Sequence, residues 1–290
     1  MRFSQPVSRL IEQRFSCRSY RQTPIAPETL EALRTAAAAI NVGPLGTPLR
    51  FGLIAATKAH TEALRGLGTY GTIKDPAGFI VGAATATGKY LEDYGYELER
   101  LILTATDLGL GTCWLGGFFT RSSFFRSIAV GDGERMPAVF SLGEIPNLET
   151  ARKGAFRRLA GGDRRLPWEN LFFSGKFGVP FAREAAGSYA EPLEMVRLGP
   201  SASNRQPWRI VKEGNAWHFY IHRTRGYRLG LAGRLLKIED LQRLDVGIAM
   251  CHFELAAREL GRDGRWAVRT PDIAMPDSLT EYVVSWVEGE

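Results

Sequence analysis

Apolar residues recur at intervals of three and four positions along two long stretches of the chain. Residues 90–108 and 240–260 both follow the i, i+3, i+4, i+7 spacing of an amphipathic helix. A glycine, Gly109 or Gly261, directly follows each pattern. Glycine tolerates the left-handed backbone that ends many helices. The pattern therefore predicts two long helices with glycine caps, and a shorter helix over residues 29–40.

Short apolar runs lie between these helices and are typical of buried strands. Residues 174–192 are rich in glycine, alanine and proline, and they are the best candidate for an internal boundary. Predicted helices and strands occur on both sides of this boundary. The runs predicted as strands are residues 50–56, 77–83, 136–142, 208–211, 217–222 and 282–287.

The two long helices resemble each other at a constant offset of 152 residues. Shared apolar spacing alone is weak evidence, because all amphipathic helices have it. The shared glycines and the tryptophan beyond each helix indicate an internal duplication, with halves at residues 1–175 and 176–290. The matched pairs are Asp93 with Asp245, Gly95 with Gly247, Gly109 with Gly261 and Trp114 with Trp266.

Composition excludes several classes of protein. With 44% hydrophobic and 23% charged residues among 290, the chain is too apolar for intrinsic disorder. Three cysteines cannot all pair, and the N-terminal residues have no apolar signal region, so we expect a cytoplasmic protein. No stretch approaches 18 uncharged apolar residues, so we expect no membrane span.

A net charge of +6 raises the possibility of a nucleic-acid partner. No helix-turn-helix, zinc knuckle or aromatic-basic platform accompanies the charge, so a solvated surface or an anionic small ligand is the better interpretation. We therefore expect no nucleic-acid partner. The basic residues cluster at Arg152, Lys153, Arg157, Arg158, Arg164 and Arg165.

Two polar motifs are candidates for ligand binding. Arg14, Ser16 and Arg18 alternate, so an extended backbone would place two guanidinium groups and a hydroxyl on one side, as a phosphate site requires. An exposed basic turn is the alternative.

Residues 199–209 form a loop stiffened by two prolines, and its hydroxyl and amide groups suit a polar planar ligand. A capped loop before a strand is the alternative there.

A third motif follows the first long helix. Residues 108–118 contain Gly116 and Gly117, whose backbone N–H groups could approach a flat ligand closely. It is not a dinucleotide fingerprint, because its glycines follow a helix rather than a strand. The fourth motif is Arg164-Arg165-Leu-Pro-Trp, a pair of cations next to a proline.

Together these four motifs resemble the FMN-dependent nitroreductases, over residues 14–266. The resemblance implies an α+β fold, a mixed sheet flanked by helices. It also implies two interlocked subunits that each contribute residues to FMN. Arg14, Ser16, Arg18 and Arg165 would hold the phosphate, and Leu115, Gly116 and Gly117 would lie beside flavin N5. The isoalloxazine and ribityl groups would contact Pro200, Ser201, Asn204 and Gln206.

The chain departs from the family pattern in a complementary way. The loop after its first helix, residues 41–51, has other residues at the positions of the serine, asparagine and glutamine of the later loop. The second half in turn lacks an Arg-x-Ser-x-Arg segment and a Gly-Gly pair after Trp266. These losses predict a family dimer fused into one chain, an intramolecular pseudo-dimer that is a monomer with one FMN site.

The resemblance implies electron transfer from NAD(P)H through FMN to a small oxidised acceptor, such as a nitroaromatic or quinone. Binding of FMN or another anion without turnover, and a different flavin chemistry on the same scaffold, remain alternatives.

Substrate-facing segments are expected near Tyr70, residues 118–125 and Tyr227. No catalytic side chain is assigned, and Cys113 is expected to be a spectator. His218 and His222 lack a third ligand, so no metal is expected.

Overall fold

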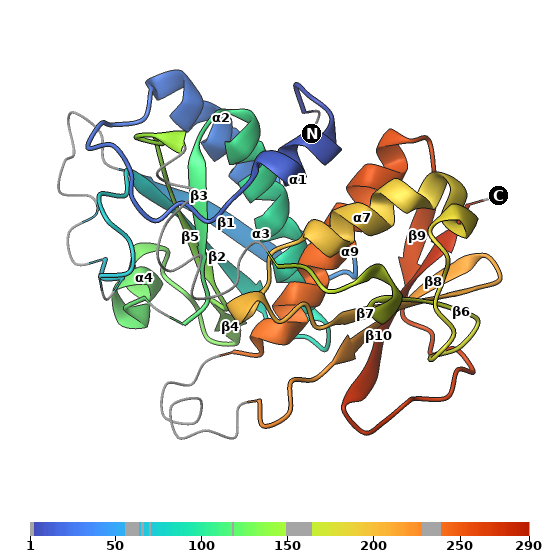
Figure 1. The fold of residues 1–290 in the computed structure, drawn as a ribbon. Helices are drawn as coiled ribbons and strands as arrows, with labels where there is room; N and C mark the ends of the chain where they lie inside the picture. Colours follow the sequence, from blue (N-terminus) through green and yellow to red (C-terminus); the bar gives the residue numbers. More distant parts are fainter. Residues whose placement is uncertain are drawn as a thin grey trace. The chain divides into compact units, whose positions relative to one another are not determined.

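The computed structural model describes residues 3–55, 64, 67–69, 71–117, 119–148, 164–227 and 239–289. The chain forms two compact units, Met1–Asp163 and Arg164–Glu290. Each unit contains a sheet with a long helix packed on it (Figure 1), so the expected α+β class is confirmed. Residues 164–175 pack in the second unit. The boundary of the repeats after residue 175 stays a prediction, since packing and ancestry can differ.

The first unit is built around α3 (Tyr90–Asp107), which contacts the strands β2, β3 and β5 and is buried along most of its length. The sheet has the strand order β1-β2-β5-β3, and a short strand, β4, pairs with β2. All these pairs are antiparallel. The other elements are α1 (Val7–Gln13), α2 (Pro27–Ala38), β1 (Leu49–Ala55), β2 (Gly78–Thr85), β3 (Gly111–Leu115), α4 (Arg121–Ser127), β4 (Glu134–Arg135) and β5 (Val139–Gly143).

The second unit places α7 (Ala190–Leu198) beside α9 (Leu241–Glu259), as Figure 1 shows. Its strands follow the order β6-β7-β8-β10-β9, with β6 parallel to β7 and the rest antiparallel. Buried aromatic rings, among them Trp217, Phe253 and Trp286, pack on one another in its core. The other elements are η2 (Trp168–Asn170), β6 (Phe172–Ser174), η3 (Glu184–Tyr189), η4 (Ala202–Asn204), β7 (Trp208–Glu213), β8 (Ala216–His222), β9 (Gly264–Ala267) and β10 (Thr280–Glu288).

The two units repeat the same arrangement of elements. In each, a helix leads through a loop into two antiparallel strands, then a long helix, then two more strands. The strand order β1-β2-β5-β3 of one sheet corresponds to β7-β8-β10-β9 of the other. Gly109 and Gly261 follow the long helices with φ of 79° and 69°, as helix-capping glycines do. This repetition is what an internal duplication predicts.

The predicted helices and strands are all present, most of them within two residues of the predicted ends. The elements that were not predicted are α1, β3, α4, β4, β6, α7 and β9, together with the short 3-10 helices η2, η3 and η4. Within the described ranges, no helix has both the length and the apolar character needed to cross a membrane.

An ion pair near the edge of the first sheet makes the stability of this unit depend on pH. Arg50 donates to Glu134 at 2.6 Å and to the Ile128 carbonyl at 2.8 Å. The hydrogen bond from Arg50 lowers the pKa of Glu134 from 4.5 to about 2, and the Gly131 amide contributes. A carboxyl with a depressed pKa stabilises the fold above its unfolded pKa. We expect this contribution to be lost as the pH falls from 4.5 towards about 2.

Acid titration of the wild type and Glu134→Gln, followed by near-ultraviolet circular dichroism, measures this contribution. The stability of the variant should change less with pH across that window. Parallel curves for the two proteins would show that the pair contributes nothing.

Candidate functional site

The Arg14–Arg18 segment is extended and lies between two neighbouring backbones. Ser16 forms a parallel bridge with Thr112 of β3, and the Cys17 amide donates to the Thr112 carbonyl at 2.8 Å. On its other side, the Lys74 amide donates to the Arg18 carbonyl at 2.8 Å. Cys17 is fully buried, whereas Ser16 and Arg18 are half-buried. The alternation predicted for this segment is therefore present.

Arg14 is tied to a carboxylate that the sequence analysis did not single out. Its Nε lies 3.6 Å from Oε1 of Glu99 in α3, and both side chains are almost fully buried. The other oxygen of Glu99 accepts a hydrogen bond of 2.6 Å from Nε1 of Trp114. Glu99 thus connects the arginine segment to Trp114 of β3, which lies two residues before Gly116.

The Gly116–Gly117 pair directly follows β3, after the buried Leu115, and both glycines are partly exposed. Cys113 of β3 is buried, and burial raises the pKa of its thiol. A thiol with a raised pKa is a poor nucleophile. This agrees with the expectation that Cys113 is a spectator.

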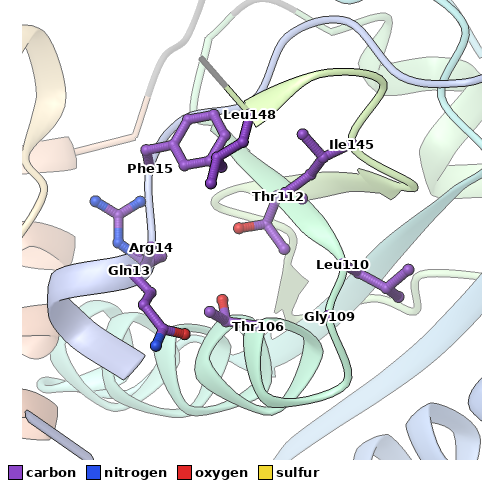
Figure 2. Close-up of a pocket in the computed structure, with 10 residues that line it drawn as sticks. Gln13, Arg14, Phe15, Thr106, Gly109, Leu110, Thr112, Ile145 and Leu148 are labelled. Atoms are coloured by element: carbon purple, nitrogen blue, oxygen red, sulfur yellow. The ribbon is translucent and has the colours of Figure 1, made fainter. Parts of the chain in front are cut away.

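A cavity of about 350 Å³ opens at the other end of β3, where Arg14 lies at its edge (Figure 2). The side chains of Gln13, Thr106 and Thr112 line it with polar groups, and Phe15, Leu110, Ile145 and Leu148 with apolar ones. The Gly116–Gly117 turn follows the opposite end of β3 and is not part of its lining.

In the second unit, the loop before β7 packs against the Arg164–Leu166 segment. Asn204 accepts from Arg165 Nη1 at 3.3 Å and donates to the Arg164 carbonyl at 2.9 Å. Gln206 accepts from the Leu166 amide at 2.8 Å. The structure therefore brings together Arg165 and two of the loop residues that the sequence singled out.

The same loop has a strained backbone. Ser203, Asn204 and Gln206 have φ of 51°, 53° and 50°, in the left-handed region that residues other than glycine rarely adopt. Each such residue costs about 1–2 kcal/mol and persists only where its surroundings hold it. Ser201 Oγ, which follows Pro200, contributes to this by accepting from the Gln206 amide at 2.8 Å.

Arg209 holds the end of the loop. Its Nη1 donates to the Gln206 carbonyl at 3.0 Å, and burial lowers the pKa of its guanidinium to about 10. That pKa is still far above neutral pH, so Arg209 keeps its charge. Concentrated strain with several anchors is a feature of ligand-binding loops.

The histidines have structural partners. His218 lies 2.6 Å from Ser285 Oγ, His222 lies 3.1 Å from Thr280 Oγ1, and His252 bonds the Met195 carbonyl at 2.9 Å. In the described part of the chain, no three metal-ligating side chains gather.

Of the expected substrate-facing residues, Tyr227 accepts a hydrogen bond of 2.9 Å from the Leu241 amide at the start of α9. Tyr70 and Phe118 lie outside the described residues. So do four members of the basic cluster: Arg152, Lys153, Arg157 and Arg158.

Sequence reasoning missed the buried carboxylates that hold these segments. Glu99 is one, and Asp245 of α9, whose two oxygens accept from the Ala202 amide at 3.0 and 3.1 Å, is another. For Asp245 a signal existed, since it is one of the positions that match at the 152-residue offset. For Glu99 there was none, because it is one of several acidic residues along α3.

Comparison with known proteins gives one family and one fold. The family described as "Putative TM nitroreductase" matches residues 7–257. Among curated proteins, none is similar enough to this chain to count as a match. A "putative nitroreductase" from Thermotoga maritima is 19% identical with a TM-score of 0.62, covering 99% of this chain and 95% of that chain. This likeness shows a shared fold over nearly the whole chain.

Two further solved structures correspond to about half of the chain. A nitroreductase family protein from Clostridium difficile 630 is 20% identical, with a TM-score of 0.38, covering 51% of this chain and 86% of that chain. A "putative nitroreductase in complex with FMN" from Desulfovibrio desulfuricans is 19% identical, with a TM-score of 0.36, covering 50% of this chain and 89% of that chain. Both scores are too low to carry an argument.

Proposed function

Because this chain belongs to the nitroreductase family matched over residues 7–257, we propose that it is an FMN-dependent oxidoreductase that takes electrons from NAD(P)H. It passes them to a small oxidised acceptor, such as a nitroaromatic or a quinone. The observation that carries the proposal is the strained loop of the second unit, which holds Asn204 and Gln206 against the backbone next to Arg165.

The donors of the two units suit different parts of FMN. Arg14, Ser16 and Arg18, with Arg165, would bind the phosphate, because guanidinium groups pair with a largely dianionic phosphate through charge-assisted hydrogen bonds. Pro200, Ser201, Asn204 and Gln206 would contact the isoalloxazine and ribityl groups. The proposal assigns both sets to one FMN per chain.

The residues beside the reactive edge would act through their backbone. Bound FMN would supply hydride and electron transfer between the nicotinamide and the acceptor. Leu115, Gly116 and Gly117 would direct backbone N–H groups at flavin N5, on the reactive edge of the ring. No side-chain acid or base is assigned, in keeping with the buried thiol of Cys113.

Absorption spectroscopy tests the proposal directly. We expect the purified protein to be yellow, or to quench its tryptophan fluorescence when FMN is added. NADH or NADPH added without oxygen should then bleach the flavin. A colourless protein whose fluorescence does not respond to FMN would contradict every flavin function.

Binding without turnover is the second candidate, and one observation favours it. Residues 43–47 of the first unit keep a well-formed loop without ligand-binding side chains, so this scaffold tolerates loss of a site. Colour that persists with both nicotinamides would support this second function.

A further inference from the structure

Each long helix carries a buried aspartate near its start, facing the loop that leads into the first long strand of its unit. Asp93 of α3 accepts from the Leu45 amide at 2.7 Å and from the Thr47 amide at 2.9 Å. Asp245 of α9 accepts from the Ala202 amide at 3.0 and 3.1 Å. The two aspartates occupy equivalent positions, since they match at the offset of the internal repeat.

The two loops differ in what they carry. Residues 43–47 contain no serine, asparagine or glutamine, and a Cβ on Gly43 would overlap Asp93, so this loop closes tightly onto its aspartate. Residues 201–206 carry Ser201, Asn204 and Gln206, two of them with positive φ. The aspartate is therefore common to both loops, whereas the ligand-binding groups are found in only one.

Burial of both aspartates disfavours the charged form of their carboxyl groups. Burial raises the pKa of both Asp93 and Asp245, and the loop amides lower it. Asp240 lies near Asp245 and raises its pKa further, although Asp240 is itself paired with Arg223 at 2.7 Å. A buried carboxylate is tolerated where it is hydrogen-bonded, so each aspartate and the loop amides that donate to it depend on one another.

We propose that Asp245 is a positioning residue for flavin binding. By accepting the Ala202 N–H, it fixes the start of the strained turn that presents Asn204 and Gln206. The inference rests on the proposed function, because it assumes that this loop contacts FMN. Asp93 does the same for a loop without ligand-binding groups, so its role is confined to stability.

Asp245→Ala removes the acceptor, and we expect it to weaken FMN binding about 10-fold in a fluorescence titration, since the loop no longer has one defined conformation. Asp245→Asn keeps an oxygen for the Ala202 amide and should restore the affinity to within about 3-fold of the wild type. Asp93→Ala is the matched control. Asp93→Ala should lower the melting temperature but leave the FMN affinity unchanged.

Asp245→Leu serves if the alanine variant does not fold, because leucine has the same branched shape and buries no charge. It should show the same loss of FMN affinity. Wild-type FMN affinity in folded Asp245→Ala and Asp245→Leu, or an equal loss of FMN affinity in Asp93→Ala, would overturn the inference and leave the proposed function standing. A wild-type protein that binds no FMN would instead overturn the proposed function itself.

Discussion

Replacing Arg18 by alanine is expected to weaken FMN binding about 10- to 100-fold, because one charge-assisted hydrogen bond contributes roughly 1.5–3 kcal/mol. The backbone of the segment should survive the change. Its hydrogen bonds run through main-chain atoms, such as the Arg18 carbonyl that accepts from Lys74 at 2.8 Å. A flavin fluorescence titration of the wild type and the variant measures the loss.

Riboflavin separates a phosphate contact from general damage to the site. It lacks the phosphate, so Arg18→Ala should bind it as well as the wild type does. Arg21→Ala is the matched control, because Arg21 is an exposed arginine three residues later whose side chain bonds the Pro146 carbonyl at 3.3 Å. The control should keep the FMN affinity. An unchanged FMN affinity in Arg18→Ala would remove Arg18 from the site.

The sequence pattern predicted those elements that are determined by residues close together in the chain. The helices α3 and α9 have long, regular apolar faces and end at glycines, so their limits follow from residues within one segment. The strand β3 was missed because residues 111–115, flanked by glycines, read as part of a turn. It becomes a strand only through pairing with β5 and through its bridge to Ser16.

The candidate site likewise has some features that local sequence determines and others that tertiary packing determines. Alternating residues suffice to place Arg14, Ser16 and Arg18 on one side of an extended segment. Nothing local shows that Arg165 contacts Asn204, which lies 39 residues later in the chain, or that Gln206 has a positive φ. These features depend on tertiary packing and on anchors such as Asp245, which look like ordinary polar positions of a helix.

Removing the Glu99 side chain is expected to destabilise the first unit by about 3 kcal/mol or more, since breaking a buried ion pair leaves a charge without its partner. Its side chain is fully buried and that of Arg14 is 6% exposed. Glu99→Ala also deprives Trp114 Nε1 of an acceptor at 2.6 Å. Denaturant unfolding followed by tryptophan fluorescence measures the loss.

A surface pair of nearly equal length provides the control. Arg34 and Glu31 of α2 lie 3.8 Å apart, against 3.6 Å for Arg14 and Glu99, but the Glu31 side chain is 71% exposed. Exposed pairs contribute about 0–1 kcal/mol, so Glu31→Ala should leave the unfolding midpoint almost unchanged. Glu99→Gln keeps an acceptor for Trp114 while removing the charge, and should fall between the two. Equal midpoints for Glu99→Ala and Glu31→Ala would show that burial does not strengthen the Arg14–Glu99 pair, and that Arg14 is held in place by other contacts.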